Sequence, residues 1–286
     1  MKISLITACY NSAGTIGTAI ESVLSQKGVD VEYIVVDGGS KDGTVEVVEE
    51  FSRKERKDRK EGFEFKWISE RDRGMYDAIN KGIRMATGDV VGILNADDVL
   101  ASDDTLAHIA ELFSRAGGRV STQRLRGSEA QREDGQGDVE CVYADIRFVK
   151  EGETVEALRG AETVRYCSAK RWRPWMFRFA AMVPHPSFYV RRECFERLGG
   201  YSLDYRICAD FELELRYLYL AKLRAAYLPE CVVVMRMGGM STAGWRSNVL
   251  INREDLRALR AHGIWSCMPL IYLKYLFKIW GFVFRG

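Results

Sequence analysis

The chain has 286 residues, 47% of them hydrophobic and 29% charged, a composition that excludes disordered, collagen-like and mini-protein classes. Lysine and arginine number 42 and aspartate and glutamate 40, so the global charge gives no reason to expect a nucleic-acid partner. The charge is uneven, because residues 238–286 hold 7 basic and 2 acidic side chains, a net charge of +5. This basic and aromatic C-terminal end predicts an anionic surface as a local partner.

The cysteines and the N-terminus indicate the compartment. The 7 cysteines are odd in number, widely spaced and without a CxxC pair, which favours free thiols in a reducing compartment over a disulfide framework. The first residues, MKISLITACYNS, hold a short apolar run that polar residues follow at once, so we predict a strand and not a signal peptide. We therefore expect a cytoplasmic protein. The basic, aromatic C-terminal end favours a place at the inner face of the cytoplasmic membrane.

Strand and helix patterns alternate from the start of the chain. The apolar run Ile3–Ala8 predicts a strand, and the apolar spacing within Ile16–Ser25 predicts an amphipathic helix. The unit repeats with a strand over Glu32–Val36, a glycine-rich turn, and a helix over Thr44–Phe51 with Thr44 as its N-cap. Two such units in succession predict a parallel sheet.

The next segments continue this alternation. The charged stretch Ser52–Glu61 extends the second helix or leaves it as a loop, and in both cases lies on the surface. A strand is predicted over Phe63–Ser69, a helix over Asp77–Thr87, and a fully apolar, buried strand over Val90–Leu94. The α/β order of these elements indicates one main domain.

Beyond residue 100 the pattern is less regular. Residues 117–138 lose nearly all large apolar side chains, which predicts a mobile surface insertion, and residues 171–186 are aromatic and irregular. The remaining predicted elements are a helix over Thr105–Arg115, a hairpin of Cys141–Phe148 with Thr154–Ala157, helices over Arg191–Leu198 and Asp210–Leu220, and a strand over Leu228–Met235.

Polar residues follow three of the predicted strands, at 7–11, 37–40 and 95–98. Ligands of open parallel sheets bind at the carboxyl ends of the strands, so these residues are candidates for a site. The G-x-G-x-x-G fingerprint and the P-loop are both missing after the first strand, which argues against dehydrogenases and P-loop NTPases. Asp97 and Asp98 follow a buried strand directly, and a hard divalent cation would offset their repulsion. Asp98 as a simple helix cap is the alternative.

Four segments together are similar to the family 2 glycosyltransferases, inverting nucleotide-sugar enzymes of GT-A fold: ISLITACYN (3–11), VVDGGSKDGT (35–44), DRGMYDAINKG (72–82) and GDVVGILNADD (88–98). The resemblance implies an α/β fold, a mostly parallel sheet flanked by helices, over residues 1–237. Weaker similarity to capsular and exopolysaccharide members continues to about residue 242 and implies an active-site loop from 238. After this loop, the residues themselves predict a basic, amphipathic helical tail to 286.

The resemblance also implies roles for residues near the first two strands. Tyr10 would stack on the nucleobase, with Thr7 and Asp37 at the base edge and the ribose. Asn11 and Gly74 would lie in the same donor-binding set. Packing of Tyr10 within a turn, and Asp37 as a helix cap, are the alternatives.

The later motifs would meet the donor sugar and the diphosphate. The resemblance implies contacts from Asp77, Asn80, Lys81 and Asn95, and a Mn²⁺ or Mg²⁺ ion on Asp97 or Asp98, where Asn95 replaces the usual first aspartate of the motif. Lys81 as an ordinary surface-helix residue is the alternative.

His185 and the late segment CADFELELR (208–216) complete the set. His185 would touch diphosphate or acceptor, or be a buried histidine bonded to backbone. Asp210 matches the family's general base, with Ala209 where a glutamate is usual, while Glu212 and Glu214 are expected on a solvated face. The GGMS segment from Gly238 resembles a loop over the site, and a plain turn is the alternative.

The segment from Trp265 to Phe284 is a long apolar run interrupted by Lys274 and Lys278. Two central lysines would cost about 5–7 kcal/mol in a membrane span, so spanning is not expected. We expect a helix in the membrane interface, or one that packs on the body with its lysines reaching solvent.

These features predict an inverting transferase that moves sugar from a UDP-sugar, or from a GDP- or dTDP-sugar, to a saccharide hydroxyl on a lipid-linked acceptor. A nucleotidyltransferase is the nearest rival, but its basic glycine-rich loop is missing. The sequence also leaves open transfer to a polyprenyl phosphate, and a non-catalytic role as a scaffold that binds a nucleotide-sugar.

Overall fold

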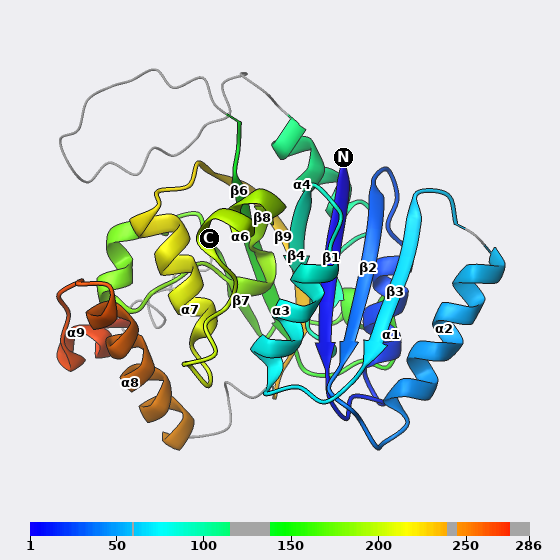
Figure 1. Ribbon diagram of the computed structural model, residues 1–286, viewed down its shortest axis with the longest axis horizontal. Helices are drawn as coiled ribbons and strands as arrows, with labels where there is room; N and C mark the ends of the chain where they lie inside the picture. The colour runs from blue at the N-terminus through cyan, green and yellow to red at the C-terminus, as the bar shows by residue number, and fades with distance from the viewer. Residues whose placement is uncertain (59, 115–137, 239–244, 275–286) are drawn as a thin grey trace.

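The computed structural model describes residues 1–58, 60–114, 138–238 and 245–274, and within them the chain forms one mixed β-sheet with helices on both faces (Figure 1). The surface insertion expected at 117–138 falls outside these ranges except for Asp138, and the loop expected from Gly238 does so except for that residue.

The first half of the chain forms a parallel sheet with strand order β3-β2-β1-β4. Its elements are β1 (Lys2–Cys9), α1 (Ile16–Leu24), β2 (Asp30–Asp37), α2 (Thr44–Asp58), β3 (Phe63–Ser69), α3 (Met75–Met85) and β4 (Val90–Ile93). Cys9 lies opposite Asp37, and Asp37 opposite Ser69, so these strands end at one edge. The predicted strands and parallel pairing are confirmed.

The second half adds antiparallel pairs to this sheet. From β4 the strand order continues through β8, β6 and β9 to β5. Strands β6 and β9 are parallel. The other three pairs, β4–β8, β8–β6 and β9–β5, are antiparallel. The elements are β5 (Val99–Leu100), α4 (Thr105–Ser114), β6 (Cys141–Val149), α5 (Val155–Gly160), β7 (Arg165–Cys167), β8 (Tyr189–Arg191), α6 (Arg192–Leu198) and β9 (Ala225–Arg236).

The hairpin predicted between Cys141–Phe148 and Thr154–Ala157 is wrong. Thr154 is the N-cap of α5, and its Oγ1 accepts a hydrogen bond from the Ala157 N–H at 3.1 Å. The strand that follows β6 and pairs with it antiparallel is β7. A β-branched pair at 154 and 155 suggested a strand, but the local capping bond favours a helix.

The N-cap predicted for the second helix is also wrong. Thr44 is already the first residue of α2, and Gly43 precedes it with its carbonyl accepting from the Val47 N–H at 3.2 Å. The Asp42 carboxylate accepts from the Thr44 N–H at 3.1 Å. The charged stretch from 52 continues this helix as far as Asp58.

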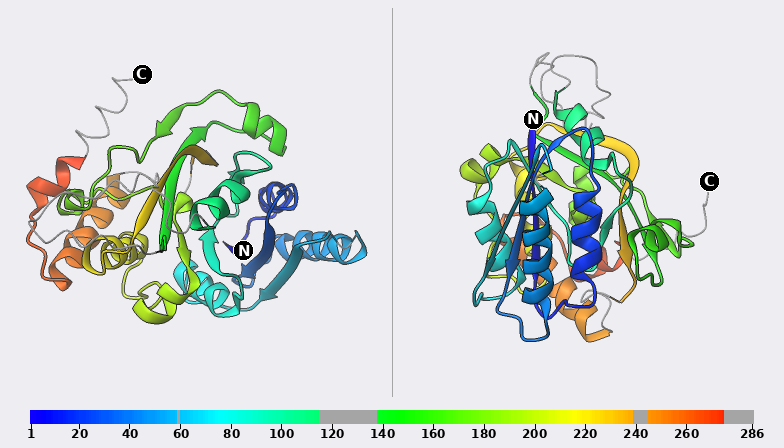
Figure 2. Two further views of the ribbon diagram at one scale, coloured as in Figure 1. Left: turned by 90° about the horizontal axis from the view of Figure 1, so that it is seen from above. Right: turned by 90° about the vertical axis from the view of Figure 1, so that its right-hand side faces the viewer.

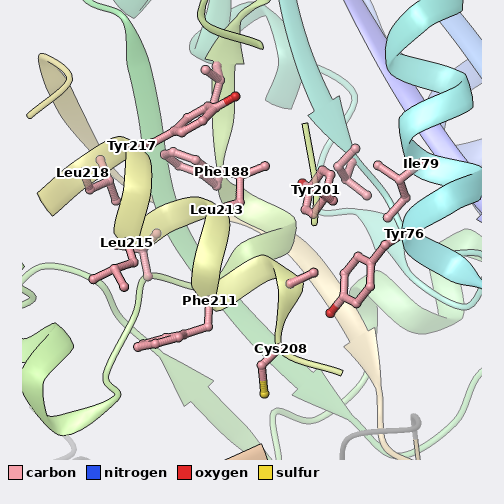
Figure 3. Packing of buried hydrophobic residues seen from close by; sticks show 14 of the residues in the cluster. Tyr76, Ile79, Phe188, Tyr201, Cys208, Phe211, Leu213, Leu215, Tyr217 and Leu218 are labelled. Carbon is pink, nitrogen blue, oxygen red and sulfur yellow. The ribbon is translucent and has the colours of Figure 1, made fainter. Parts of the chain in front are cut away.

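Alternation along the strands divides the core into two layers. Ile6 and Ile34 face a cluster with residues of α3 and the C-terminal helices, shown in part in Figure 3. Leu5 and Tyr33 face the other cluster, with residues of α1 and α4. Seen from above (Figure 2, left), α1 and α4 lie on one side of the sheet and α3 lies on the other.

The C-terminal helices cover the layer around α7 (Ala209–Glu214), which continues as a π-helical turn, η3 (Leu215–Leu220). The remaining elements are η1 (Pro174–Phe179), η2 (His185–Ser187), α8 (Trp245–Ala261) and α9 (Met268–Tyr272). Helix α8 packs on α7, and α9 packs on α8 and η1. In the ranges described, no helix has the length and apolar character needed to cross a membrane.

The expectation that both tail lysines reach solvent is wrong for Lys274. Its side chain is 7% exposed, and Nζ lies 2.8 Å from the Asp255 carboxylate on α8. A buried anion on the neighbouring helix therefore holds this lysine inside the fold. Lys278 lies outside the described residues.

Candidate functional site

The turns after β1 and β2 meet at the carboxyl edge of the sheet. Tyr10 is 61% exposed, and its ring lies against Gly38. A Cβ at Gly38 would lie 2.5 Å from the Asp72 carboxylate and 3.4 Å from the Tyr10 ring, so glycine lets both side chains approach the backbone here without moving. The face of Tyr10 is thus available for stacking beside a carboxylate of the loop after β3.

Asp37 ends β2, but its carboxylate is used inside the loop. Oδ2 accepts from the Gly39 and Ser40 N–H groups, each at 3.0 Å, and from the Ser69 hydroxyl at 2.6 Å; Oδ1 accepts from the Ser40 hydroxyl. Burial alone would raise the pKa of Asp37, but these hydrogen bonds outweigh it and hold the pKa below its usual value. Asp37 therefore shapes the loop, and its expected contact with a base or ribose stays a prediction.

Thr7 and Asn11 also act within the protein. Thr7 is fully buried, and its hydroxyl bonds to Tyr33 at 2.9 Å and to the Leu94 carbonyl at 2.8 Å. Its expected place at the base edge stays a prediction. Asn11 has φ of +50°, and its Oδ1 accepts from the Lys41 N–H at 3.0 Å. It thereby ties the turn after β1 to the turn after β2.

Local hydrogen bonds shape the start of α3. Gly74 has φ of +118° and donates its N–H to Asp72 at 2.8 Å, and Asp77 accepts from the Arg73 N–H at 3.0 Å. Gly74 ends the loop before α3, and Asp77 lies in the first turn of the helix. A positive φ of this size favours glycine at 74.

Asn80 and Lys81 hold protein segments together. Asn80 donates to the Tyr201 carbonyl at 2.8 Å and accepts from the Tyr201 N–H at 2.9 Å. Lys81 donates to the Arg71 carbonyl at 2.9 Å and lies 2.8 Å from the Glu70 carboxylate. Both side chains therefore hold protein segments in place here, and the direct donor contacts expected of them stay predictions.

The turn after β4 contains the acidic pair. Asp98 is 1% exposed; Asn95 donates to its Oδ2 at 2.7 Å, while its buried Oδ1 has no hydrogen-bond partner among the described residues. Burial, and then the neighbouring Asp97, raise the pKa of Asp98 well above its usual value. Arg236, at the end of β9, donates to the Asp97 carbonyl. Asp98 precedes β5 and caps no helix, so the capping alternative is wrong.

These residues fit a divalent cation. An unpartnered, buried carboxylate oxygen is costly unless a donor or cation meets it. No group of three or more His, Cys, Asp or Glu side chains in the described ranges could enclose a metal ion by itself. Mg²⁺ and Mn²⁺ accept one or two carboxylates when substrate phosphates and water complete the shell, which is the arrangement that Asp97 and Asp98 could provide.

Asp210 lies in the first turn of α7, facing the start of α3. Its Oδ1 accepts from the Tyr76 hydroxyl at 3.2 Å and from the Phe211 N–H at 2.8 Å. Burial raises the pKa of Asp210 to about 6. The preceding turn is held by Glu254 of α8, which accepts from the N–H groups of residues 206, 207 and 208 at 2.9–3.0 Å.

A series of contacting side chains, most of them buried, leads from Asp210 to Glu214. The Tyr76 ring stacks on Tyr201 at 5.6 Å, and the Tyr201 hydroxyl lies 3.0 Å from His185 Nε2. His185 Nδ1 lies 3.5 Å from Glu214 Oε1. Glu214 is fully buried, which raises its pKa to about 7. His185 is half-buried, and its partners are side chains rather than backbone. Its contact with diphosphate or acceptor stays a prediction.

The solvated face expected for Glu212 and Glu214 is wrong. Glu212 is 4% exposed and pairs with Arg216 and His262, each at 2.8 Å. Both glutamates are buried because α8 and the segment around His185 cover α7, which the helix's own sequence cannot show.

Three further residues have clear roles that the sequence did not suggest: Tyr76, Arg236 and Glu254. Tyr76 lies inside the segment 72–82, and its hydroxyl could have been noted as a donor. Arg236 and Glu254 lie in ordinary strand and helix patterns, and no local signal distinguishes them.

The arrangement joins an exposed aromatic face, an acidic pair suited to a cation and a basic carboxylate. The fold is that of the GT-A glycosyltransferases. The structure of S. aureus TarS 1–349 in complex with UDP-GlcNAc aligns with a TM-score of 0.58 and 17% identity, covering 90% of this chain and 67% of that one. A mannosyltransferase from Pyrobaculum calidifontis, in complex with GDP-Man and Mn²⁺, aligns at 0.56 and 19%, covering 99% and 81%. The chain spans 40% of the longer TarS structure.

Residues 4–178 match the model of glycosyl transferase family 2, and the chain belongs to this family. It is therefore a glycosyltransferase, as the four segments predicted. A PGL/p-HBAD biosynthesis glycosyltransferase of Mycobacterium bovis is 26% identical over 90% of this chain and 83% of its own length. An uncharacterized glycosyltransferase of Mycobacterium tuberculosis is 30% identical over 75% and 68%.

Proposed function

We propose that the protein is an inverting glycosyltransferase that moves a sugar from a nucleotide-diphosphate sugar, with UDP as the expected nucleotide, to a saccharide hydroxyl on a lipid-linked acceptor in polysaccharide biosynthesis. The observation that carries the proposal is Asp210, whose pKa of about 6 leaves it charged yet basic at neutral pH. The protein would work in the cytoplasm, at the inner face of the membrane.

In this mechanism Asp210 takes the proton of the acceptor hydroxyl while the hydroxyl oxygen bonds to the anomeric carbon. The bond between that carbon and the diphosphate oxygen breaks, and the nucleoside diphosphate leaves with the electron pair. In-line attack turns an α-linked donor into a β-linked product. Tyr76 fixes Oδ1 of Asp210, so Oδ2 would face the acceptor.

The donor would lie along the carboxyl edge of the sheet. Tyr10 would stack on the base, and Gly74 and Asp77 would border the donor site. Asp97 and Asp98 would hold Mn²⁺ or Mg²⁺, which supplies Lewis-acid stabilisation of the diphosphate when bound. Arg236 holds the backbone of this acidic turn from the end of β9.

The relatives support the nucleotide and product classes. S. aureus TarS 1–349 binds UDP-GlcNAc and, in another structure, UDP. A poly-beta-1,6-N-acetyl-D-glucosamine synthase of Staphylococcus epidermidis is 35% identical over 114 residues, 40% of this chain and 26% of its own length. The mannosyltransferase with GDP-Man keeps a GDP-sugar as the alternative donor.

The test of the base is Asp210→Asn, measured as transfer from radiolabelled nucleotide-sugars to membrane extracts. We expect turnover to fall by about 10²–10⁴-fold, the usual contribution of a general base. Asp204→Asn is the matched control, since it makes the same change at an exposed position six residues earlier. Wild-type turnover in Asp210→Asn would refute the mechanism.

The test of the donor is thermal stability against UDP, GDP, CDP and dTDP, each with and without Mn²⁺. We expect a shift with UDP that requires Mn²⁺ and is lost in Asp97→Ala. Binding without sugar turnover would favour a sensor or scaffold. Product that extracts into organic solvent without a saccharide primer would favour transfer to a polyprenyl phosphate.

A further inference from the structure

Helix α8 exposes a row of arginines. Arg253, Arg257 and Arg260 are exposed, and their spacing of four and three residues places them on one side of the helix. The positions between them, 254–256 and 258–259, are all buried. From residue 253 onward, the outward face of α8 is therefore a row of positive charges.

The two acidic residues of this region are turned inward. Glu254 is 7% exposed and bonds to the turn before α7, and Asp255 is 3% exposed and pairs with Lys274. Neither can neutralise the exposed arginines at the surface. Like charges three or four residues apart also disfavour a helix slightly, so local helix stability does not explain the row.

The arginines border a groove that is partly apolar. The groove has a volume of about 730 Å³, and its walls are Arg253, Leu256, Arg257, Arg260, Ala261 and Met268. Met268 begins α9, so the groove runs between the two helices. Three exposed apolar or aromatic side chains lie in the segment after α8: Trp265 at 71%, Tyr272 at 47% and Leu273 at 37%. A basic row beside exposed aromatic residues is the pattern of proteins that lie on anionic bilayers.

We propose that the surface formed by Arg253, Arg257 and Arg260, with the adjoining groove and Trp265, docks the protein on an anionic phospholipid bilayer. The arginines meet headgroup phosphates, while Met268 and Trp265 enter the headgroup region. This inference deepens the proposed function, on which it rests, because a lipid-linked acceptor is presented at such a surface. The surface lies on the side of the molecule opposite α2 (Figure 1).

The arginines differ in their use for a test. Arg257 donates to the Asp204 carbonyl and lies over the Tyr205 ring at 4.4 Å, so its replacement would disturb the turn before Asp210. The side chains of Arg253 and Arg260 make no ion pair or hydrogen bond with the residues that the structure describes. The variant is therefore Arg253→Glu with Arg260→Glu, and the control is Lys54→Glu with Lys57→Glu, an equal charge change on exposed positions of α2.

The experiment is co-sedimentation of the full chain with vesicles of phosphatidylcholine alone or with about 30% phosphatidylglycerol. Wild type is expected to bind the anionic vesicles only, and less as salt rises from about 0.05 M to about 0.5 M. Each arginine near such a surface contributes about fivefold in affinity, so the double variant should bind about 25-fold more weakly or worse, and the control as wild type.

Three outcomes would overturn the proposal: equal binding to neutral vesicles, undiminished binding by the double variant, or equal loss in the α2 control. Inorganic phosphate is tested separately by thermal shift. A shift that needs Arg253 and Arg260 without vesicle binding would mean a small-anion site instead. Vesicle binding is measured without donor, so it can fail while Asp210-dependent turnover stands, and the reverse also holds.

Discussion

The buried surroundings of Asp210 affect both the rate of the proposed reaction and the stability of the folded protein. The carboxylate lies among Tyr76, Tyr201 and Phe211, and burial moves its pKa toward neutrality. A carboxylate with a pKa near 4 would be a weak base, and one with a pKa above 8 would be protonated. A pKa of about 6 makes the Asp210 carboxylate a suitable base at neutral pH. The same burial makes the folded protein less stable when this carboxylate is charged.

The first consequence is a pH profile. If Asp210 is the base, it acts only when deprotonated, so kcat/KM should rise about tenfold per pH unit below about 6 and level off above it. The measurement is initial rate against pH at low donor concentration. A flat profile across this range would contradict the assignment, and Asp204→Asn should keep the wild-type profile.

The second consequence concerns stability. The pKa of Asp210 is raised from 3.8 to about 6 on folding, so the proton-linked stability is complete below pH 3.8 and is lost as pH rises through 6. Asp210→Asn removes that loss. It should raise Tm at pH 8 by an amount equivalent to at most about 3 kcal/mol, less because the side chain is partly exposed, and have little effect at pH 4. A lower Tm for the variant at pH 8 would show that its hydrogen bonds matter more.

For single residues, the sequence could predict which side chains lie near the candidate site better than what each of them does there. Asp97, Asp98 and Asp210 were found because acidic residues follow a buried strand or match a motif. Asn80 was expected at the donor, yet it binds the backbone of Tyr201, which is 121 residues away. A polar side chain in a motif can bind substrate or hold the loop that does so, and only the fold distinguishes the two.

One buried ion pair links the two C-terminal helical segments that pack beside α7. Asp255 of α8 and Lys274 beyond α9 are both nearly fully buried, 2.8 Å apart. Burial raises the pKa of Asp255, and Lys274 opposes that rise. The pair therefore fixes where α9 lies more than it adds to net stability.

Removing one partner should show this. Lys274→Met leaves a buried carboxylate without its cation and should cost about 3 kcal/mol in the free energy of unfolding. Lys274→Met combined with Asp255→Asn should recover most of that loss. Denaturant unfolding of both single variants and the double variant completes the cycle; purely additive effects would mean that the pair is not coupled.

The helices and strands of the first hundred residues were predictable because their apolar spacing is regular. For the tail, the sequence left open a helix in the membrane interface and a helix packed on the body. The pairing of Lys274 with Asp255 has no local signal in the sequence, because the two residues lie in different helical segments. The prediction at Thr154 was wrong because its β-branched side chain suggests a strand, whereas its hydroxyl caps a helix.

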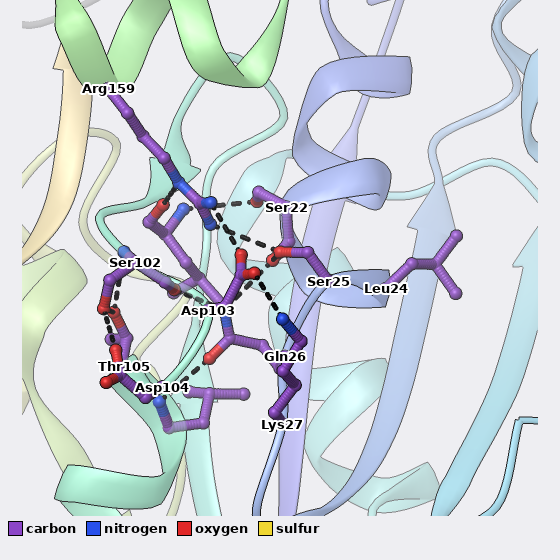
Figure 4. A network of polar contacts seen from close by, with 12 residues as sticks. Ser22, Leu24, Ser25, Gln26, Lys27, Ser102, Asp103, Asp104, Thr105 and Arg159 are labelled. Atoms are coloured by element: carbon purple, nitrogen blue, oxygen red, sulfur yellow. Dashed lines mark hydrogen bonds and ion pairs between the residues drawn. The ribbon is translucent and has the colours of Figure 1, made fainter.

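Across the whole molecule, one arginine joins segments that are far apart in sequence. Arg159 of α5 bonds to the Leu100 carbonyl at 2.9 Å, to Asp103 at 2.7 Å and to the Ser25 hydroxyl at 3.3 Å (Figure 4). Lys27 lies 3.0 Å from the same Asp103. The end of α1, the turn before α4 and the end of α5 thereby meet at one point.

Arg159→Met should therefore destabilise the whole domain. It leaves the Leu100 carbonyl and Asp103 without this donor, at a cost of about 2 kcal/mol. Arg84→Met, at an exposed position on α3, should cost less than about 0.5 kcal/mol. Both are measured by urea unfolding, and equal values for the two would mean that the network adds nothing. Such a long-range network has no signal in the sequence, because its members are 56 to 134 residues apart.

The position of β9 means that one part of the sheet can form only after this late strand has been synthesised. Among the strands that the structure describes, β9 is synthesised last, yet it lies between β6 and β5. Arg236 at its end reaches Asp97, 139 residues earlier, and Thr18, 218 residues earlier. The edge that carries Tyr10 is made of strands that are synthesised before β9. The acidic turn after β4 gains its bond from Arg236 only once β9 has been synthesised and paired.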